Sequence, residues 1–446
     1  MFAPHPPPPA FNPLRKPIHS RGFPLTATAV PAADSSVNPY WRRNLYVCLF
    51  GSFTNMAGMT LMLPFLPNYI RDLGVKDNDG IVFWSAVAFS AAFLAAATVS
   101  PIWGWLADLY GRKPMLIRAS LGMAIAMSMM GMAHNVYELV ALRAATGFLG
   151  GYTSGCVILV ASQTPKDRSA WALGKLSVGS LSGSLLGPLI GGVLPGIFGL
   201  RDTFLMTGAV IFVTFLLTTF VIREDPSLRP KRKDGKLPPV WSVVPDKRPI
   251  LVMLVSATLL LVANMSIEPI ITIYVGEIAR PGENVVFLAG LAMSAAAFAA
   301  MIAAPRIGRF ADRHGHWRVI VASFVAAGVL LIPQAFVTAP WQLVILRFLM
   351  GLALAGLMPA ITALIRRNAP DSAIGRILGF SQSAQYLGQI VGPLAGAFVA
   401  DRFGMSAVFL ATAAAMLAGA ALNAGMRAQV ERAVASGELD EAFTRR

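Results

Sequence analysis

The sequence has little charge and few cysteine or histidine residues. Asp, Glu, Lys and Arg make up 13% of the 446 residues, about half of the roughly 25% typical of soluble domains. Cys48 and Cys156 both fall in apolar stretches, and the five histidines have no ligand spacing, so we expect no disulfide framework, metal site or cofactor. No Walker A motif is present, which argues against ATP as the direct energy source.

Long apolar stretches make up most of the chain. Hydrophobic residues account for 55% of it, and the mean hydropathy is +0.62. Such stretches can cross the roughly 30 Å hydrocarbon core of a bilayer as helices. We therefore expect an all-α membrane protein with twelve transmembrane helices. The predicted spans are 44–70, 81–103, 115–134, 137–161, 171–197, 201–222, 248–278, 284–305, 317–337, 341–365, 374–400 and 405–426.

The basic residues predict the orientation. A net charge of +15 would suit nucleic acid if these residues formed one soluble face, but they lie in short segments between the predicted spans. With the N-terminus inside, the inside segments hold 30 of the 37 Lys and Arg residues and the outside loops hold 5. The positive-inside rule then places both termini in the cytoplasm. We expect no nucleic-acid partner.

An internal repeat divides the chain into two halves. The charged stretch 104–114 recurs at 308–316, with its shared residues displaced by 204 positions. Six spans return the chain to its starting side, so the halves have the same orientation. Parallel six-span repeats joined by a polar loop are typical of alternating-access transporters. Pairs displaced by 204 or 205 are Gly104/Gly308, Asp108/Asp312, Gly111/Gly315, Arg143/Arg347, Gly147/Gly351, Tyr69/Tyr274, Gly187/Gly392, Pro188/Pro393 and Gly191/Gly396.

The repeat and the composition predict five regions. Residues 1–43 are proline-rich and lack the apolar core of a signal peptide. We expect a disordered cytoplasmic tail there, unless the true start lies further along the chain. The other regions are an N-terminal six-helix bundle at 44–222, a cytoplasmic linker at 223–247, a C-terminal six-helix bundle at 248–426 and a cytoplasmic tail at 427–446.

Three motifs resemble those of the major facilitator superfamily, and the resemblance covers nearly all of residues 40–426. The stretch 104–113 resembles the loop signature called motif A. Leu142–Gly147 resembles motif B of the fourth span, and 183–192 resembles motif C of the fifth. The stretches similar to MdtG-type multidrug efflux proteins, within the twelve-span drug:proton antiporter family, are 41–45, 63–67 and 171–174.

The resemblance implies a proton-coupled secondary transporter of the bacterial inner membrane, folded as two parallel six-helix bundles. It implies export of drugs or other lipophilic small molecules by alternating access. A proton-coupled importer, or a narrow-specificity exporter of a metabolite, stays open as the alternative. Because the sequence has no nucleophile–base pair or paired catalytic carboxylates, we do not expect an enzyme. The expected partners are a small-molecule substrate, protons and lipid, and the expected state is a monomer.

The hairpin 104–114 is the predicted gate. An aspartate at the end of a span can accept hydrogen bonds from free N–H groups at a neighbouring helix N-terminus. For Asp108 we expect the eleventh span, from near Ile374, to be the partner, and the resemblance implies that this contact stabilises the outward-facing state. Setting the topology is the alternative role. In the second copy His316 and Trp317 replace two basic residues, which predicts a weaker contact. The predicted gating residues are Gly104, Asp108, Gly111, Arg112, Lys113 and Asp312.

Glu268 is the predicted proton site. It is the acidic residue that lies well inside a span, about ten residues from the outer end of the seventh, and burial favours the neutral form of a carboxyl group. Pro269 can kink the helix beside it. Arg143 and Arg347 are cations within spans, which are functional by default, and the resemblance to motif B implies a coupling role. The alternatives are an always-ionised Glu268 with Asp108 as the proton carrier, and arginines that snorkel to the interface.

The motif C stretch and a set of polar and methionine residues complete the predicted site. Small residues at four-residue spacing permit close helix packing in lipid, and Pro188 introduces a kink. Packing alone is one interpretation, and the resemblance adds a seal against proton leak. The motif C residues are Gly183, Gly187, Pro188, Gly191 and Gly192. The candidate substrate contacts are Asn55, Met59, Met62, Asn264, Gln382 and Gln385. Flexible thioethers suit varied lipophilic ligands, although we expect most methionines to pack or face lipid.

Overall fold

The computed structural model describes residues 38–436 apart from 166, 226–239, 245 and 371–372. Most of the predicted N-terminal tail and linker, and the end of the C-terminal tail, lie outside the described residues. The regular structure of the described part is helical, as predicted. The helices are α1 (Trp41–Leu61), α2 (Leu66–Asp72), α3 (Asn78–Tyr110), α4 (Arg112–Met130), α5 (Val136–Leu149), α6 (Tyr152–Gln163), α7 (Ser169–Phe198), α8 (Leu200–Phe220), α9 (Arg248–Ile267), α10 (Ile271–Ile278), α11 (Val285–His314), α12 (His316–Gln334), α13 (Pro340–Leu354), α14 (Leu357–Asn368), α15 (Ile374–Phe403) and α16 (Met405–Ala435).

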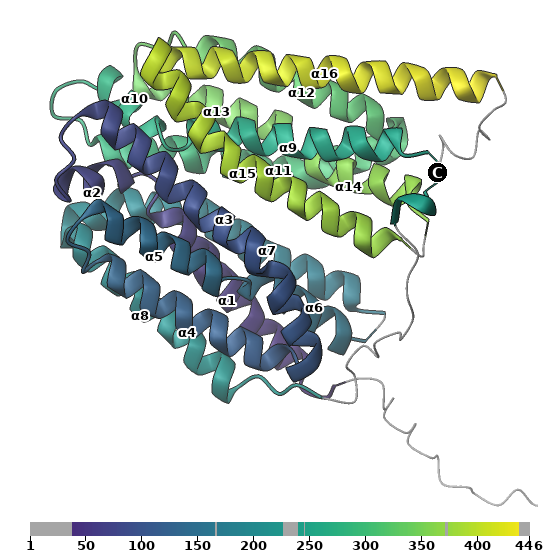
Figure 1. Cartoon of the computed structure of the whole chain (residues 1–446), viewed down its shortest axis with the longest axis horizontal. Coiled ribbons are helices and arrows are strands. Elements are labelled where there is room, and N and C mark those ends of the chain that lie inside the picture. The colour runs from purple at the N-terminus through teal and green to yellow at the C-terminus, as the bar shows by residue number, and fades with distance from the viewer. Residues whose placement is uncertain (1–37, 166, 226–239, 245, 371–372, 437–446) are drawn as a thin grey trace, which may run out of the picture. The chain divides into compact units, whose positions relative to one another are not determined.

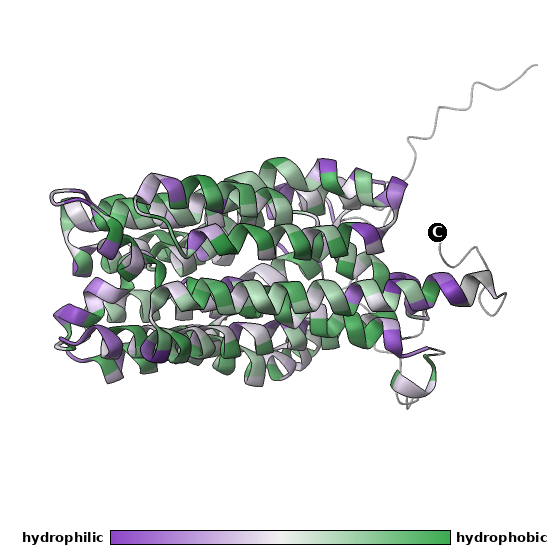
Figure 2. Cartoon of the chain, turned by 90° about the horizontal axis from the view of Figure 1, so that it is seen from above, coloured by the Kyte–Doolittle hydropathy of each residue, from purple (hydrophilic) through white to green (hydrophobic). Residues whose placement is uncertain are grey.

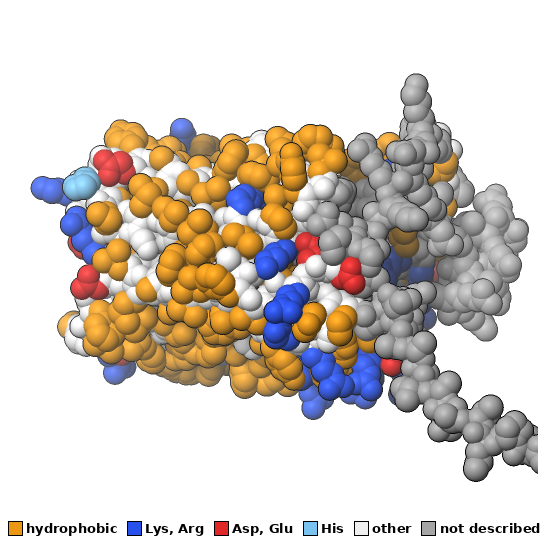
Figure 3. All heavy atoms as spheres, turned by 90° about the horizontal axis from the view of Figure 1, so that it is seen from below, with side chains coloured by type: hydrophobic (Ala, Val, Ile, Leu, Met, Phe, Trp, Pro, Cys, Tyr) orange, Lys and Arg blue, Asp and Glu red, His pale blue; other side chains and the backbone are white. Residues whose placement is uncertain are grey.

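Most of these helices suit a bilayer. In the described part of the chain, nine helical stretches are long and apolar enough to cross a membrane, and a tenth arises if α1 and α2 form one span bent by 56°. Figure 2 shows hydrophobic residues along the helices and hydrophilic residues mainly at their ends. Figure 3 shows the apolar cover from below, with Lys and Arg side chains gathered toward the right. Exposed side chains such as Phe336 at 68% and Phe398 at 61% suit lipid rather than water.

Four of the predicted spans are broken into two helices. The breaks lie between α1 and α2, α5 and α6, α9 and α10, and α13 and α14. They fall in the first, fourth, seventh and tenth predicted spans, which repeat at every third span. Broken helices inside a membrane are tolerated where protein covers the freed backbone groups or a cavity receives them. Within these four spans the sequence predicted only a kink at Pro269, so the regular pattern of breaks is a finding of the structure.

The two charged hairpins have the same backbone. Gly111 joins α3 to α4 with a φ of 97°, and Gly315 joins α11 to α12 with a φ of 96°. Positive φ is costly for residues that carry a Cβ, so glycine lets one helix end and the next begin without a loop. Both hairpins lie toward the right of Figure 1, opposite α2 and α10. We call these two ends the hairpin end and the α2/α10 end.

The described residues from 38 onward belong to one compact unit, Val37–Arg446. Within it, α1–α8 pack mainly on one another, as do α9–α16. Figure 1 shows the first set in purple to teal below the second set in green to yellow. Two pairs of long helices join the sets, α3 with α15 and α7 with α11. The described helices of residues 44–222 and 248–426 follow this arrangement, although the division into two separate bundles stays a prediction.

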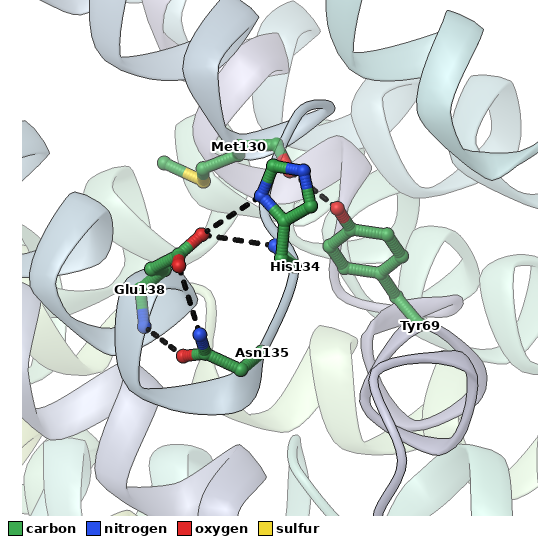
Figure 4. A network of polar contacts seen from close by, with 5 residues as sticks. All are labelled: Tyr69, Met130, His134, Asn135 and Glu138. Carbon is green, nitrogen blue, oxygen red and sulfur yellow. Dashed lines mark hydrogen bonds and ion pairs between the residues drawn. The ribbon is translucent and has the colours of Figure 1, made fainter.

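The repeat extends to individual contacts at the α2/α10 end. Tyr69 of α2 donates its hydroxyl to the carbonyl oxygen of Met130, where α4 ends (Figure 4). Its counterpart Tyr274 of α10 donates to the carbonyl oxygen of Gln334 at 2.8 Å, where α12 ends. Nearby, the amide N–H of Glu138 donates to Asn135 Oδ1 at 2.9 Å and caps α5. The paired tyrosine contacts anchor both short helices in the same way.

Candidate functional site

A row of glycines holds α7 against α1. A Cβ atom at Gly183 would lie 2.5 Å from the carbonyl oxygen of Phe53, and one at Gly191 would lie 1.7 Å from that of Leu61. At Gly187 it would lie 2.0 Å from Thr60 Oγ1. Since atoms cannot approach so closely, the four-residue spacing is what lets these two helices touch. Helix α7 continues through Pro188 without a break.

The second half packs α15 on α9 in the same way. A Cβ atom at Gly388 would lie 2.6 Å from the carbonyl oxygen of Thr258, and one at Gly396 would lie 2.1 Å from that of Ser266. These two glycines are the repeat partners of Gly183 and Gly191. The packing interpretation of the motif C stretch therefore agrees with the geometry of both halves, while the proton seal stays a prediction.

The remaining motif C residues contact the other half. A Cβ atom at Gly192 of α7 would lie 3.0 Å from the Cα atom of Phe287 of α11, and one at Gly290 would lie 2.3 Å from the carbonyl oxygen of Pro188. Ser294 of α11 donates its hydroxyl to the carbonyl oxygen of Leu185 at 2.7 Å. These contacts fasten α7 to α11 over their parts nearer the α2/α10 end.

The pair α3 and α15 mirrors this contact. Ser90 of α3 donates its hydroxyl to the carbonyl oxygen of Ile390 of α15 at 2.8 Å. Ser90 and Ser294 are displaced by 204 positions, and their acceptors Leu185 and Ile390 by 205. Two equivalent hydrogen bonds therefore tie the halves together, and both lie on the α2/α10 side of the long helices.

At the hairpin end, glycines of the same four long helices have no close neighbours. Added Cβ atoms would meet no heavy atom within 4 Å at Gly104 of α3, Gly174 of α7, Gly308 of α11 or Gly375 of α15. The predicted close approach of a neighbouring helix at Gly104 is not made in this conformation. At these four positions the long helices leave open space near the hairpin end, whereas Gly192 and Gly290 bring α7 and α11 into close contact nearer the other end.

Two buried arginines lie at equivalent positions of the two halves. Arg143 of α5 is 1% exposed and Arg347 of α13 is 4% exposed. Within the described residues, Nε and Nη1 of Arg143 and Nε and Nη2 of Arg347 have no hydrogen-bond partner. The guanidinium of Arg143 lies 5.4 Å from the centre of the Phe89 ring. Since Arg143 and Arg347 are buried, neither snorkels to the interface, and unpaired buried donors are costly.

Glu268 lies at the break between α9 and α10. It caps the C-terminus of α9, and its side chain is half-buried. Of the charged side chains, Arg347 is the one whose charge acts on this carboxyl group. The structure therefore brings two of the three predicted proton-coupling residues together, one from each of two broken spans. Their role in coupling stays a prediction.

The first hairpin holds a carboxylate that the sequence analysis missed. The amide N–H groups of Arg112 and Lys113, at the start of α4, donate to the two carboxylate oxygens of Glu224 at 3.0 and 2.9 Å. Glu224 follows α8 and so closes this helix N-terminus from within the same half. The side chain of Asp108 lies outside the described residues, so its predicted contact with α15 stays a prediction.

The second hairpin differs from the first. Asp312 is exposed, and its Oδ1 lies 3.4 Å from Nε2 of His316, which is buried at the start of α12. The contact lies within the hairpin itself, between the end of α11 and the start of α12. The predicted difference between the two copies is therefore present in their contacts, although the strength of either as a gate stays a prediction.

The candidate substrate residues occupy varied environments. Asn55 is buried and donates from Nδ2 to the carbonyl oxygen of Gly51 in its own helix at 3.0 Å. Met62 is fully buried in the hydrophobic core, and Met59 packs against that core. Gln382 is exposed. Asn264 and Gln385 are half-buried. These residues do not yet define a binding surface, and their contact with a substrate stays a prediction.

Comparison with known proteins gives the family. The family model described as the Major Facilitator Superfamily matches residues 48–284 and 253–440. The chain is 44% identical over 379 residues to "Multidrug resistance protein MdtG" of Dickeya zeae, covering 84% of this chain and 92% of that protein. The protein of the same name from Salmonella typhimurium is 42% identical over 385 residues, covering 86% and 95%.

Two solved structures share the fold. The nucleoside transporter NupG matches with a TM-score of 0.72 and 15% identity, covering 86% of this chain and 99% of that one. A bacterial homologue of the human lysosomal transporter Spinster, in an inward-facing and unoccupied conformation, matches with a TM-score of 0.66 and 15% identity, covering 86% and 96%. At this identity the likeness concerns the fold alone.

Proposed function

We propose that this chain, which belongs to the major facilitator superfamily and is a multi-pass protein of the bacterial inner membrane, is a proton-coupled exporter of drugs or other lipophilic small molecules. The identity of 42–44% to multidrug resistance proteins over most of the chain supports the substrate class. Three features support transport by alternating access. They are the broken spans, the buried arginines with unpaired donors, and the long helices that pack closely toward the α2/α10 end but leave open glycines at the hairpin end.

The proposed topology has twelve spans, with the hairpin end in the cytoplasm. Helices α4 and α15 are not among the ten apolar spans, and together with those ten they make up the proposed twelve. Helix α4 begins with basic residues and α15 carries glutamines, which lowers their hydropathy. Even so, α4 packs chiefly on α8, and α15 on α9 and α3, so both run among the apolar helices. The basic residues of the hairpins then lie inside, as the positive-inside rule requires.

In this topology the structure corresponds to the inward-facing state. The hydrogen bonds of Ser90 and Ser294 close the outer side. The open glycines, among them Gly104 and Gly308, lie on the cytoplasmic side. In the alternate state the outer contacts separate, and the glycines receive the neighbouring helices. A substrate taken from the cytoplasm would enter the inward-facing state and leave from the outward-facing one.

The neighbourhood of Glu268 and Arg347 is the observation that carries proton coupling. Protonation of the carboxyl group removes a negative charge beside a buried cation that has unpaired donors. Loss of the proton restores the attraction between them. Because Glu268 lies at the junction of α9 and α10, each change of charge acts where the seventh span can bend. The proton would bind from outside and leave to the cytoplasm, in exchange for the drug.

A vesicle assay tests this function. Inverted membrane vesicles are energised, and a pH-sensitive dye reports collapse of the proton gradient when a lipophilic drug is added. We expect collapse with the wild type and none with Glu268→Gln, which keeps the shape of the side chain but cannot ionise. Glu277→Gln in α10 is the matched control, because Glu277 is exposed; it should retain the response.

Each part of the proposal has its own contrary result. If no drug changes the gradient in wild-type vesicles, multidrug exchange is wrong. If Glu268→Gln retains the full response, another group carries the proton and antiport itself stands. The alternative function, a proton-coupled importer or a narrow-specificity exporter of a metabolite, predicts collapse with one metabolite class rather than with several unrelated drugs. Import further predicts drug or metabolite movement in the same direction as the protons.

A further inference from the structure

The first hairpin shows that this helix junction accommodates an anion. Helix α4 begins at Arg112, directly after Gly111, and the Glu224 carboxylate accepts hydrogen bonds from its first two N–H groups at 3.0 and 2.9 Å. A negative charge at a helix N-terminus satisfies free donors and interacts favourably with the helix dipole. In the first half, the chain itself supplies this anion.

The second half lacks the carboxylate. Helix α12 begins at His316, directly after Gly315, with the same backbone geometry. The position equivalent to Glu224, at the displacement of 205 that Gly199 and Gly404 share, is Gln429 of α16. Gly315, which precedes α12, has no side chain that could cap it. This N-terminus faces a cavity of about 430 Å³ instead.

The cavity is positively charged. Its lining comes from the C-terminal ends of α11, α14 and α16 and the start of α12. Glu431 is engaged by Arg427 at 2.8 Å, and Asp312 lies 3.4 Å from His316. Arginines outnumber the carboxylates by four to two. The charged lining residues besides the histidines are Arg313, Arg318, Arg367, Arg427, Asp312 and Glu431.

A buried, unpartnered ring nitrogen adds to the site. His316 lines the cavity and is 5% exposed, and its Nδ1 has no hydrogen-bond partner among the described residues. Arg367 of α14 lies close enough for its charge to act on this imidazole. A buried polar atom without a partner is costly. A ligand oxygen could satisfy it together with the helix N-terminus.

We propose that this cavity binds a phosphate group, held by the N-terminus of α12, His316 and Arg367. Helix N-termini and arginine suit phosphate because they offer several N–H donors and positive charge. The volume admits a phosphate alone or the headgroup of an anionic phospholipid. Under the proposed topology the cavity lies at the cytoplasmic face, where anionic headgroups are present. The proposal does not depend on the transported substrate or on proton coupling.

The first experiment uses inorganic phosphate on the delipidated full chain in neutral detergent. Thermal unfolding is followed as phosphate is titrated, with chloride at matched ionic strength as the salt control. We expect the unfolding midpoint to rise with phosphate and to level off, because a ligand of the folded state stabilises it. Arg367→Gln should weaken the apparent affinity about tenfold, the loss expected for a charge-assisted hydrogen bond. The equivalent position in the first half, Ser162, carries no charge.

Two further variants sharpen the test. Arg366→Gln removes the neighbouring exposed arginine, which does not line the cavity, and should retain the wild-type response. Gln429→Glu places a carboxylate at the position equivalent to Glu224 and should reduce the response by occupying the site. Loss of the response in Arg366→Gln to the same degree as in Arg367→Gln would overturn the proposal, because general surface charge would then explain it.

Nanodiscs identify the source of the phosphate group. The wild type and Arg367→Gln are compared in phosphatidylcholine discs with and without phosphatidylglycerol. Stabilisation by phosphatidylglycerol that Arg367→Gln loses supports a lipid headgroup. Stabilisation by inorganic phosphate alone supports a soluble phosphate compound. If neither raises the unfolding midpoint of the wild type above the matched controls, the site is not a phosphate site.

Discussion

The packing of α7 on α1 makes a direct prediction for Gly191→Ala. The added Cβ atom would lie 1.7 Å from the carbonyl oxygen of Leu61, whereas real Cβ contacts essentially never fall below 3.0 Å. The two helices would therefore have to separate by about 1.3 Å at this point, the difference of these distances. Because the clash is with backbone, no change of rotamer relieves it.

The magnitude follows from two opposing effects. Forcing an extra carbon into a packed contact costs about 1–3 kcal/mol, and a rigid backbone neighbour favours the upper part of that range. Alanine in place of glycine gains about 1 kcal/mol of helix propensity. We expect Gly191→Ala to lower the free energy of unfolding by about 2 kcal/mol. Gly174→Ala, in the same helix, meets no heavy atom within 4 Å, so it should instead raise it by up to about 1 kcal/mol.

Unfolding of the purified proteins in detergent, followed by heat or denaturant, measures both variants beside the wild type. Gly396→Ala in the second half should behave like Gly191→Ala, since its Cβ atom would lie 2.1 Å from the carbonyl oxygen of Ser266. Equal stability of Gly191→Ala and Gly174→Ala would refute the reasoning, because the close approach of α1 would then contribute nothing.

Two further predictions concern the gate. Ser90→Ala and Ser294→Ala each remove one hydrogen bond between the halves, worth about 1 kcal/mol. Each should make cysteines introduced at the α2/α10 end about fivefold more accessible to labelling. Ser177→Ala is the control and should have no effect, because its hydroxyl bonds within its own helix. Unchanged labelling in all three variants would contradict the interpretation that these hydrogen bonds hold the α2/α10 end closed. Gly104→Leu should leave stability unchanged, because its surroundings are open here, but should abolish transport if a helix must approach in the other state. Gly425→Leu in α16 also enters open space and should transport normally, so full activity of both variants would remove Gly104 from the gate.

The sequence predicted the transporter family because its signals are local. The length of an apolar stretch predicts a span, and glycines at four-residue spacing predict close packing. Gly183, Gly187 and Gly191 of α7, which pack against α1, are the example. The sequence left open whether Arg143 and Arg347 are buried or snorkel to the interface, and the packing of the helices buries both. Family and membrane class agree with the comparisons. The breaks in the four regularly spaced spans were missed as a pattern, because prolines mark only two of them, at Pro64 and Pro269, and the other two contain glycine.

What the sequence determined by itself was the repeat and the residues whose charge or size is unusual for a membrane, while the orientation of the repeat stays a prediction. These depend on order along the chain. The tertiary structure alone decided that Glu224 meets the start of α4 and that Ser90 meets the carbonyl oxygen of Ile390. It also placed Arg347 near enough to Glu268 for their charges to interact. A carboxylate, a guanidinium or a free N–H group favours any suitable partner within reach. Only the packing of the helices brings one such partner close enough.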